Sequence, residues 1–176
     1  MECLFFLNKT VNRPKIPDLS QDYETVLWRP SLFKIKPAGL SWRPFAIWWL
    51  FHISGIFKNR RYAILLIYQK GQMIHHSCIF PKYSRFPFMD KTDLQVGDTW
   101  TAPEARGKGL AVYALTLILK DYANDTNVWY LTTPDNTASI RVAEKCGFSI
   151  YAKGRRYKCL GISLLGNYNF SENDIL

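Results

Sequence analysis

Two glycines lie close together in a short basic segment, Arg106-Gly107-Lys108-Gly109-Leu110-Ala111. The segment follows a strand-like run, Leu94–Thr101, and precedes a helical run, Val112–Asn124. Glycines let the backbone approach a ligand closely, and the first N–H groups of a helix have no partner within the helix. The pattern therefore predicts an anion site. It is not a dinucleotide fingerprint, which needs a third glycine, and it is not a Walker A loop, which needs Gly-Lys-Ser/Thr.

A second segment, residues 136–148, has the features of a short capped helix. Asp135 or Asn136 can cap the start of the helix, and Gly147 stands where a left-handed residue ends one. The apolar residues between them suit a helix, namely Ile140, Val142 and Ala143. The sequence therefore predicts a helix over Asn136–Lys145.

Together, the two segments resemble the two signatures of the GNAT (Gcn5-related N-acetyltransferase) superfamily, in its bacterial small-molecule form. The pattern R-x-x-G-x-A after Pro103-Glu104 is similar to the family's pyrophosphate loop, and Glu144-Lys145-Cys146-Gly147-Phe148 is similar to the end of its other signature. Both lie within residues 93–148. The resemblance implies an α+β GNAT fold: a single mixed, mostly antiparallel sheet flanked by helices, whose splayed central strands hold acetyl-CoA.

The resemblance also assigns residues to the cofactor. The splayed strands would be Leu94–Thr101 and Asn127–Thr132. Main-chain groups of Trp100 and Thr101 would bind the pantetheine arm, while Asn136 and Ser139 would contact the cofactor from the other side. The pyrophosphate would lie on the amides of the loop, formed by Arg106, Gly107, Lys108, Gly109, Leu110 and Ala111.

Acetyl transfer to an amine requires a neutral nitrogen, a stabilised oxyanion and a proton for the departing thiolate. A backbone amide around Trp100–Thr101 would stabilise the oxyanion. The family often uses a carboxylate on this strand as the base, and the candidates are Asp98 and Asp93, with Glu104 as a third. Strand alternation puts Asp93 and Asp98 on opposite faces unless a bulge intervenes. We favour Asp98, which lies nearer the thioester end.

The proton donor departs from the family pattern. Many members carry a Tyr two residues before the Lys of the second signature, and this chain has Ala143 there. Tyr151, Tyr157 or water is the alternative donor. His75 and His76 are neighbours in a predicted strand, so their side chains point to opposite faces. A plain cross-strand polar residue is the favoured interpretation, and a neutral imidazole that faces the acceptor and takes a proton is the alternative.

Residues 42–57 form an aromatic, almost wholly apolar segment that also contains His52. As a helix it is shorter than the roughly 20 residues that span a bilayer. Core packing is one interpretation. The alternatives are an acceptor wall built from Trp48, Trp49 and Phe51, a homodimer contact, and a membrane-surface contact through residues 42–61 with Lys58, Arg60 and Arg61.

The remaining elements follow from hydrophobic patterns and turn residues. We expect an irregular or edge strand over Glu24–Ile35, a hairpin of Tyr62–Gln69 and Met73–Phe80, and a last strand pair, Phe148–Lys153 and Tyr157–Leu165, around the basic turn Lys153–Arg156. This order of elements is α+β on one mixed sheet. With 176 residues and no linker, residues 1–176 are expected to form a single N-acetyltransferase domain.

Composition limits the partners. The formal charge of +9 suits the phosphates of coenzyme A, a nucleotide-linked acceptor or an anionic membrane surface. No nucleic acid is expected, because the basic residues are dispersed and lack zinc-finger or helix-turn-helix spacing. No metal is expected either, because the four cysteines are scattered: Cys3, Cys78, Cys146 and Cys159. The first residues lack the basic region of a signal peptide, which favours a cytoplasmic protein, with membrane association as an alternative.

The predicted function is acetyl-CoA-dependent transfer of acetyl to a primary amine of a small molecule. An amino sugar of surface-polysaccharide biosynthesis is the favoured acceptor, because sugar amines are less basic than a lysine amine, whose pKa is about 10.4. A polyamine, a peptide amine or an antibiotic is the alternative acceptor. A non-catalytic acetyl-CoA-binding module at a membrane surface is the alternative from another class, and Ala143 is the residue that supports it.

Overall fold

The computed structural model describes residues 1–8, 16–17, 22–123, 126–157 and 166–176. Its strands are β1 (Glu2–Asn8), β2 (Tyr23–Trp28), β3 (Ala63–Gln69), β4 (Gln72–Pro81), β5 (Leu94–Thr101), β6 (Val128–Thr132), β7 (Ser149–Arg156) and β8 (Tyr168–Asn169). Its α-helices are α1 (Trp42–Ile53), α2 (Leu110–Tyr122) and α3 (Thr137–Lys145). The described strands form one sheet in the order β2-β3-β4-β5-β6-β1-β7-β8. Only β5 and β6 pair in parallel among them, which confirms the expected α+β fold with a mixed, mostly antiparallel sheet.

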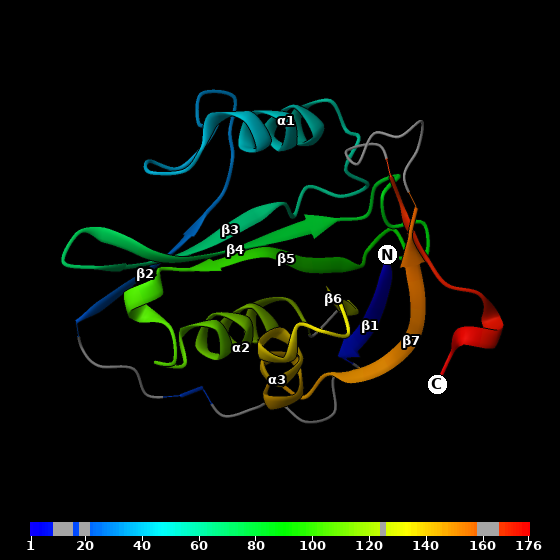
Figure 1. The fold of residues 1–176 in the computed structure, drawn as a ribbon. Helices are drawn as coiled ribbons and strands as arrows, with labels where there is room; N and C mark the ends of the chain where they lie inside the picture. Colours follow the sequence, from blue (N-terminus) through cyan, green and yellow to red (C-terminus); the bar gives the residue numbers. More distant parts are fainter. Residues whose placement is uncertain (9–15, 18–21, 124–125, 158–165) are drawn as a thin grey trace.

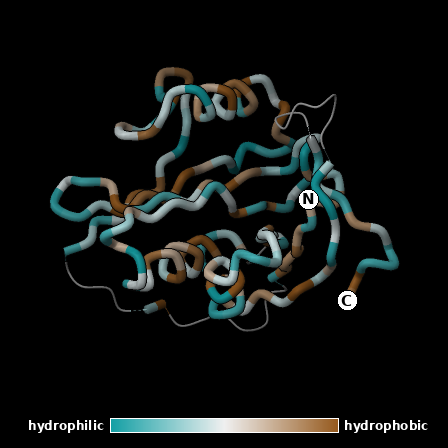
Figure 2. Tube along the Cα trace, in the orientation of Figure 1, coloured by the Kyte–Doolittle hydropathy of each residue, from teal (hydrophilic) through white to brown (hydrophobic). Residues whose placement is uncertain are grey.

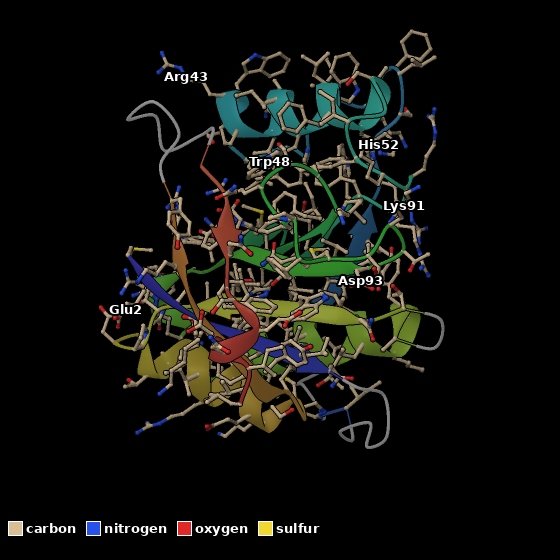
Figure 3. The ribbon with its side chains drawn as sticks, turned by 90° about the vertical axis from the view of Figure 1, so that its right-hand side faces the viewer. Glu2, Arg43, Trp48, His52, Lys91 and Asp93 are labelled. Carbon is tan, nitrogen blue, oxygen red and sulfur yellow. The ribbon has the colours of Figure 1, made fainter. Side chains whose placement is uncertain are left out.

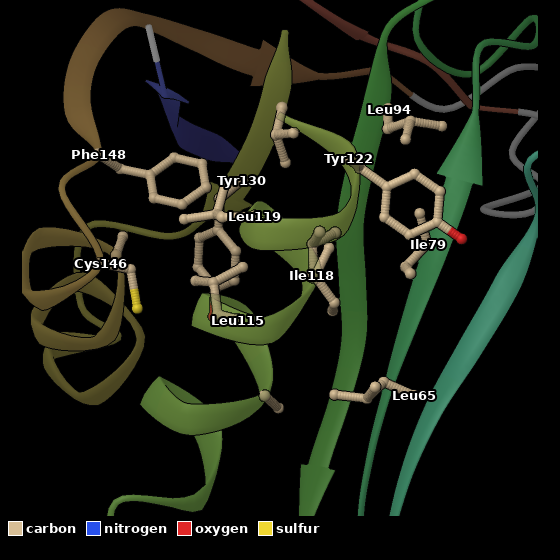
Figure 4. Close-up of a cluster of buried hydrophobic side chains, with 14 of the residues drawn as sticks. Leu65, Ile79, Leu94, Leu115, Ile118, Leu119, Tyr122, Tyr130, Cys146 and Phe148 are labelled. Atoms are coloured by element: carbon tan, nitrogen blue, oxygen red, sulfur yellow. The ribbon is translucent and has the colours of Figure 1, made fainter. Parts of the chain in front are cut away.

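The sheet separates two apolar layers. Figure 1 shows α2 and α3 on one face of the sheet and α1 on the other. The α2 face is closed by aliphatic side chains such as Leu115 and Ile118, which pack with Tyr130 and Phe148 (Figure 4). The α1 face is closed mainly by aromatic rings. In Figure 2 apolar residues also run along α1, outside the sheet.

Strand β1 was not expected. Glu2–Asn8 lies between β6 and β7, with antiparallel pairing on both sides. Phe6 packs into the α2 layer and Phe5 into the aromatic layer, and both are fully buried. A strand covered on both faces shows a continuous apolar run instead of an alternating pattern. That is why the periodicity of this segment did not reveal a strand.

Two of the expected strands have different limits. β2 ends at Trp28, before Pro30, and Ser31 and Lys34 exchange backbone hydrogen bonds in a turn. Proline lacks the N–H that a ladder needs, which explains the end of the strand. The predicted basic turn Lys153–Arg156 is wrong, because β7 continues through it and pairs with β1 and β8. Of the predicted strand Tyr157–Leu165, residues 158–165 lie outside the described residues.

The helices of the two signatures are close to expectation. α2 begins at Leu110, directly after the glycine loop and two residues before the expected run Val112–Asn124; Gly107 and Gly109 both have φ of +79° and keep the loop left-handed up to the start of the helix. α3 begins after Asn136, whose side-chain oxygen accepts the Ser139 N–H at 3.1 Å. This cap confirms the predicted start of α3.

Candidate active site

The central strands β5 and β6 separate. They pair only over Leu94–Val96 and Val128–Tyr130 within the described residues. A cleft of about 570 Å³ opens beyond the paired segment. Its lining comes from β5, the glycine loop, α2, β6 and α3: Thr99, Trp100, Thr101, Ala105, Arg106, Gly107, Gly109, Leu110, Ala111, Val112, Tyr130, Ala138, Ser139, Arg141, Val142 and Lys145.

The glycine loop forms one wall of this cleft. All of its predicted binding residues line the cleft except Lys108. The first hydrogen bond of α2 runs from the Tyr113 N–H to the Gly109 carbonyl at 2.9 Å, so the amides of residues 110–112 precede the helical ladder. Left-handed residues followed by free helix amides make a concave anion site. The loop therefore has the geometry that a pyrophosphate requires.

Three cations line the same cleft: Arg106, Arg141 and Lys145. Arg141 and Lys145 were not predicted, although their i, i+4 spacing within the second signature was a signal that they share one face of α3. The Arg106 Nε donates to the Thr101 carbonyl at 3.2 Å. No Asp or Glu occurs among the described lining residues, which makes the cleft suitable for an anionic ligand.

The predicted cofactor residues of α3 divide into two roles. Asn136 caps the helix and is not part of the cleft lining, whereas Ser139 lines the cleft. Ser139 also hydrogen-bonds the Tyr130 side chain, whose pKa is raised by burial. Tyr130 was not predicted, and it places a hydroxyl in the cleft beside α3.

Strand β5 contains a β-bulge. The register shifts between His76 and Cys78, so that Asp98 and Thr99 both stand opposite Ser77. Asp98 has φ of +46°, a left-handed conformation that Asp tolerates better than most residues. One extra residue reverses the alternation of all side chains beyond it. The bulge therefore decides which β5 side chains face each helix layer.

On the α1 side, Asp98 contacts His76. The Asp98 Oδ2 lies 3.8 Å from the His76 Nε2, and the Asp98 side chain is 48% exposed. The Trp100 indole stacks on the His76 ring at 5.9 Å, and Phe45 of α1 meets the same ring edge-on at 6.1 Å. The Asp98 carboxylate and the His76 imidazole therefore lie next to each other, beside the aromatic rings of Trp100 and Phe45. They are on the α1 face of the sheet, and the glycine loop is on the α2 face.

On the α2 side, His75 organises a buried hydrogen-bond chain. Its Nδ1 lies 2.8 Å from the Thr101 Oγ1 and its Nε2 lies 3.0 Å from the Ser77 Oγ. The Ser77 Oγ lies 3.1 Å from the Thr99 Oγ1. Burial lowers the His75 pKa to about 3, and the neighbouring His76 adds to the shift. His75 is therefore neutral at pH 7 and fixes the two threonines that line the cleft.

Two of the predicted catalytic residues lie elsewhere. Asp93 is buried before β5, where its carboxylate accepts from the Trp129 Nε1 at 2.8 Å and from the Asn127 Nδ2 at 3.2 Å. Tyr151 packs against Trp129 and Phe170 in the aromatic layer. Neither residue lines the cleft, and Asp98 and His76 do not line it either. Asp93 and Tyr151 are thus held by packed neighbours, their catalytic roles stay predictions, and the half-exposed Asp98 is the base that we carry into the proposal.

The aromatic helix α1 covers the Asp98 side of the sheet. Trp48 lies between α1 and the sheet (Figure 3), packed on Phe45 and Phe80. The Trp49 indole N–H donates to the Ser31 carbonyl at 2.8 Å. Trp48, Trp49 and Phe51 were the predicted wall residues. Phe45, which was not predicted, is the α1 residue that reaches His76.

The described part of the chain contains no group of three His, Cys, Asp or Glu side chains placed to hold a metal ion. Within the same residues, no helix has both the length and the apolarity to cross a membrane.

Comparison with known proteins identifies the family. The family model "Acetyltransferase (GNAT) family" matches residues 20–148, so the chain belongs to this family, whose members are acyltransferases. A comparison with curated protein sequences finds no match.

Solved structures share the fold at low sequence identity. A GCN5-related N-acetyltransferase from Sphaerobacter thermophilus is 13% identical with a TM-score of 0.59, over 86% of this chain and 49% of that one. A GNAT acetyltransferase from Colwellia psychrerythraea is 15% identical with a TM-score of 0.56, over 86% and 53%. A tandem GNAT protein from the clavulanic acid biosynthesis pathway is 14% identical with a TM-score of 0.56, over 86% and 51%. The chain thus spans about half the length of these structures, and the assignment of residues 1–176 to one domain stays a prediction.

Proposed function

We propose that the chain uses acetyl-CoA to acetylate a primary amine of a small molecule. The observation that carries the proposal is the cleft beside the gap between β5 and β6, which the glycine loop and three cations line and whose described lining holds no Asp or Glu. The glycine loop and three cations form an anion site on the α2 side. Asp98 and His76 form a proton-accepting pair on the α1 side. Asp98 and His76 do not line the cleft; in this proposal the amine would reach the thioester where β5 and β6 no longer pair.

The residues present fit acetyl-CoA. When bound, acetyl-CoA supplies a thioester whose carbonyl carbon an amine can attack. The amides of residues 106–111 would hold its pyrophosphate, with Arg141 and Lys145 close enough to the cleft to balance the charge. Main-chain groups of Trp100 and Thr101 face a gap where β6 no longer pairs, and such groups can bind an extended amide-containing ligand as a strand edge does.

Asp98 and His76 take the proton of the attacking amine in this proposal. Asp98 is exposed enough to accept a hydrogen bond from an ammonium group, and His76 can share the proton. The Trp100 and Phe45 rings pack on the His76 imidazole and hold it beside the Asp98 carboxylate. A backbone amide of residues 100–101 stabilises the oxyanion.

Tyr130 is our candidate for protonating the thiolate. Ala143 is buried and has no group to donate. The Tyr130 hydroxyl lies beside Ser139, one helical turn before Ala143, and lines the same cleft. A hydrogen bond from this hydroxyl to the departing sulfur would replace the contribution of the usual tyrosine.

The acceptor that we favour is an amino sugar carried on a nucleotide or a lipid, as used in surface-polysaccharide assembly. We propose that the reaction takes place in the cytoplasm. Residues 25–89, which form the α1 layer and β3 and β4, contain no Asp or Glu. A polyamine would find no carboxylate in this layer to pair with its several cations, whereas Asp98 of β5 supplies the single carboxylate contact of His76 that the described residues show. The phosphate of a nucleotide-linked or lipid-linked sugar would instead be attracted by the net positive charge of residues 25–89. The Trp100 and Phe45 rings beside His76 suit the apolar face of a sugar ring.

The test is release of free thiol from acetyl-CoA in the presence of different amines. Nucleotide-linked amino sugars, polyamines, amino-terminal peptides and aminoglycosides form the panel. We expect turnover with the amino sugars to exceed that with the polyamines. If calorimetry shows that acetyl-CoA binds but no amine causes release of thiol, the result would support the alternative of a non-catalytic acetyl-CoA-binding module. The absence of the usual tyrosine at Ala143 is the feature that suggests this alternative.

A further inference from the structure

The positive charge of the chain is concentrated in one segment. Residues 25–89 contain ten Lys and Arg residues and no Asp or Glu, so they account for the whole formal charge of +9. This segment supplies α1, the turn before it and the two strands beneath it. A charge distribution of this kind creates a positive potential over one side of the molecule.

Large apolar side chains are exposed on the same side. We define the outer layer as residues 31–60, which includes α1 and the turn Ser31–Lys34. Its exposed apolar residues are Leu32 (66% exposed), Phe33 (95%), Trp42 (58%), Leu50 (53%) and Ile56 (41%). In Figure 1 the whole layer lies on the side of the sheet away from α2 and α3. Exposed apolar groups gathered on one side indicate an interaction surface.

Cations alternate with these apolar groups. Lys34, Arg43, Lys58 and Arg60 are exposed in the outer layer. Arg43 lies on the outer side of α1 in Figure 3, two helical turns from Leu50 on the same face. Apolar side chains flanked by Lys and Arg are the pattern of helices that lie flat in the headgroup region of a bilayer.

Contacts with the sheet and within the outer layer fix the position of α1. Phe45 and Trp48 attach α1 to the sheet, and the Trp49 indole ties the turn at Ser31 to the helix. The outer face therefore presents its apolar groups without unfolding. α1 has 12 residues, about 18 Å of helix, so it can lie on a bilayer and cannot cross one.

A second copy of this chain is a poor match for the surface. A two-fold dimer places the same patch against itself. Four exposed cations would then face four identical cations with no carboxylate from residues 25–89 to balance them. Anionic lipid headgroups supply the missing negative charge. We infer that the outer layer binds an anionic lipid surface and holds the protein there peripherally. The inference is independent of the proposed acetyl transfer.

The test is sedimentation with vesicles, one set of phosphatidylcholine alone and one containing about 30% phosphatidylglycerol. We expect the wild-type chain to bind the anionic vesicles and to be released by about 0.5 M salt, because exposed charges are screened at that ionic strength. Each cation near such a surface contributes roughly fivefold to binding. Reversal of two charges in Arg43→Glu/Lys58→Glu should therefore lower the partition coefficient at least about twentyfold.

A second variant, Phe33→Ser/Leu50→Ser, should also weaken binding while keeping its salt dependence. Lys120→Glu and Leu176→Ser are matched controls, since they change an exposed cation on α2 and an exposed apolar residue outside the layer. These controls should bind like wild type. Melting temperatures confirm that each variant is folded. Equal binding to both vesicle types, or unchanged binding of both double variants, would overturn the inference. A dimer dispersed by Phe33→Ser/Leu50→Ser without vesicle binding would also overturn it and assign the surface to a second copy.

Discussion

The Asp98 carboxylate lies 3.8 Å from the His76 Nε2, on the face of the sheet opposite the glycine loop. The β-bulge makes this contact, because without the extra residue Asp98 would point toward α2. His76 and Trp100 then stack on the same side. The pair thereby lies across the sheet from the glycine loop, next to the strand end where β5 no longer pairs with β6.

Replacement of Asp98 tests the proposed base. Asp98→Asn should lower kcat/KM at pH 7 by about 100-fold, the lower range for loss of an acid–base group, with the Kd for acetyl-CoA unchanged. Asp93→Asn is the comparison, since Asp93 bonds Trp129 and Asn127 and should lose about 1–3 kcal/mol of stability with a smaller effect on rate. Steady-state kinetics and urea unfolding give both quantities. Identical pH–rate profiles for wild type and Asp98→Asn would remove the carboxylate from the mechanism.

The glycine loop predicts a charge-specific loss of binding. Gly109→Glu places a carboxylate at the start of α2, where the pyrophosphate would lie, and should weaken acetyl-CoA binding by at least about 100-fold, or roughly 2.7 kcal/mol. Gly71→Glu is a matched control, because Gly71 also has a left-handed φ, of +76°, but lies in the β3–β4 turn. Both variants carry the same backbone strain. Calorimetric titration that gives equal affinities for the two variants would exclude this loop as the anion site.

Tyr130→Phe removes the hydroxyl beside Ser139 and keeps the ring in the α2 core. Loss of one hydrogen bond to the departing sulfur should lower kcat about tenfold, which corresponds to roughly 1.4 kcal/mol. The affinity for acetyl-CoA should change little. Stopped-flow measurement of thiol release separates the chemical step from product release. A variant with wild-type kcat would leave water as the proton donor.

Burial of neutral His75 predicts acid sensitivity. Its pKa is lowered to about 3 in the folded chain and returns to about 6.5 on unfolding, so the unfolded state binds more protons between these values. Stability should therefore fall as the pH drops below 6.5, by about 2 kcal/mol between pH 7 and pH 5. His52, whose pKa is also lowered by burial, adds to the same trend. Urea unfolding at several pH values gives the free energy of unfolding as a function of pH for the wild type and for His75→Gln. The difference between the two pH dependences is the contribution of His75, and equal pH dependences would contradict the prediction.

The tryptophans of α1 should differ in their effects. Trp48→Ala removes a ring packed on Phe45 and Phe80 and should cost about 3 kcal/mol. Trp49→Ala should cost less and behave as a surface residue, because its main fixed contact is the hydrogen bond to Ser31. Trp42→Ala, an exposed control, should leave the melting temperature nearly unchanged. Large destabilisation by all three would return the whole helix to the core.

Residue types alone were enough to predict the two elements that line much of the cleft. The glycines at 107 and 109 and the cap at Asn136 act over one helical turn, so their residue types were enough to predict the loop, α2 and α3. The order of strands and helices likewise gave the fold class, because alternation of strand and helix constrains a chain to few topologies.

The tertiary structure alone decided which side chains meet. β1 was hidden because its burial on both faces removes the alternating pattern, and the side of Asp98 depends on a bulge that pairing with β4 creates. Phe45 meets His76, and Tyr130 meets Ser139, across elements that are distant along the chain. Local residue types fix backbone conformation over a few residues, whereas contacts between elements depend on strand register and packing. For this reason the conformation of the glycine loop was predictable from the sequence, and the surroundings of the proposed base were not.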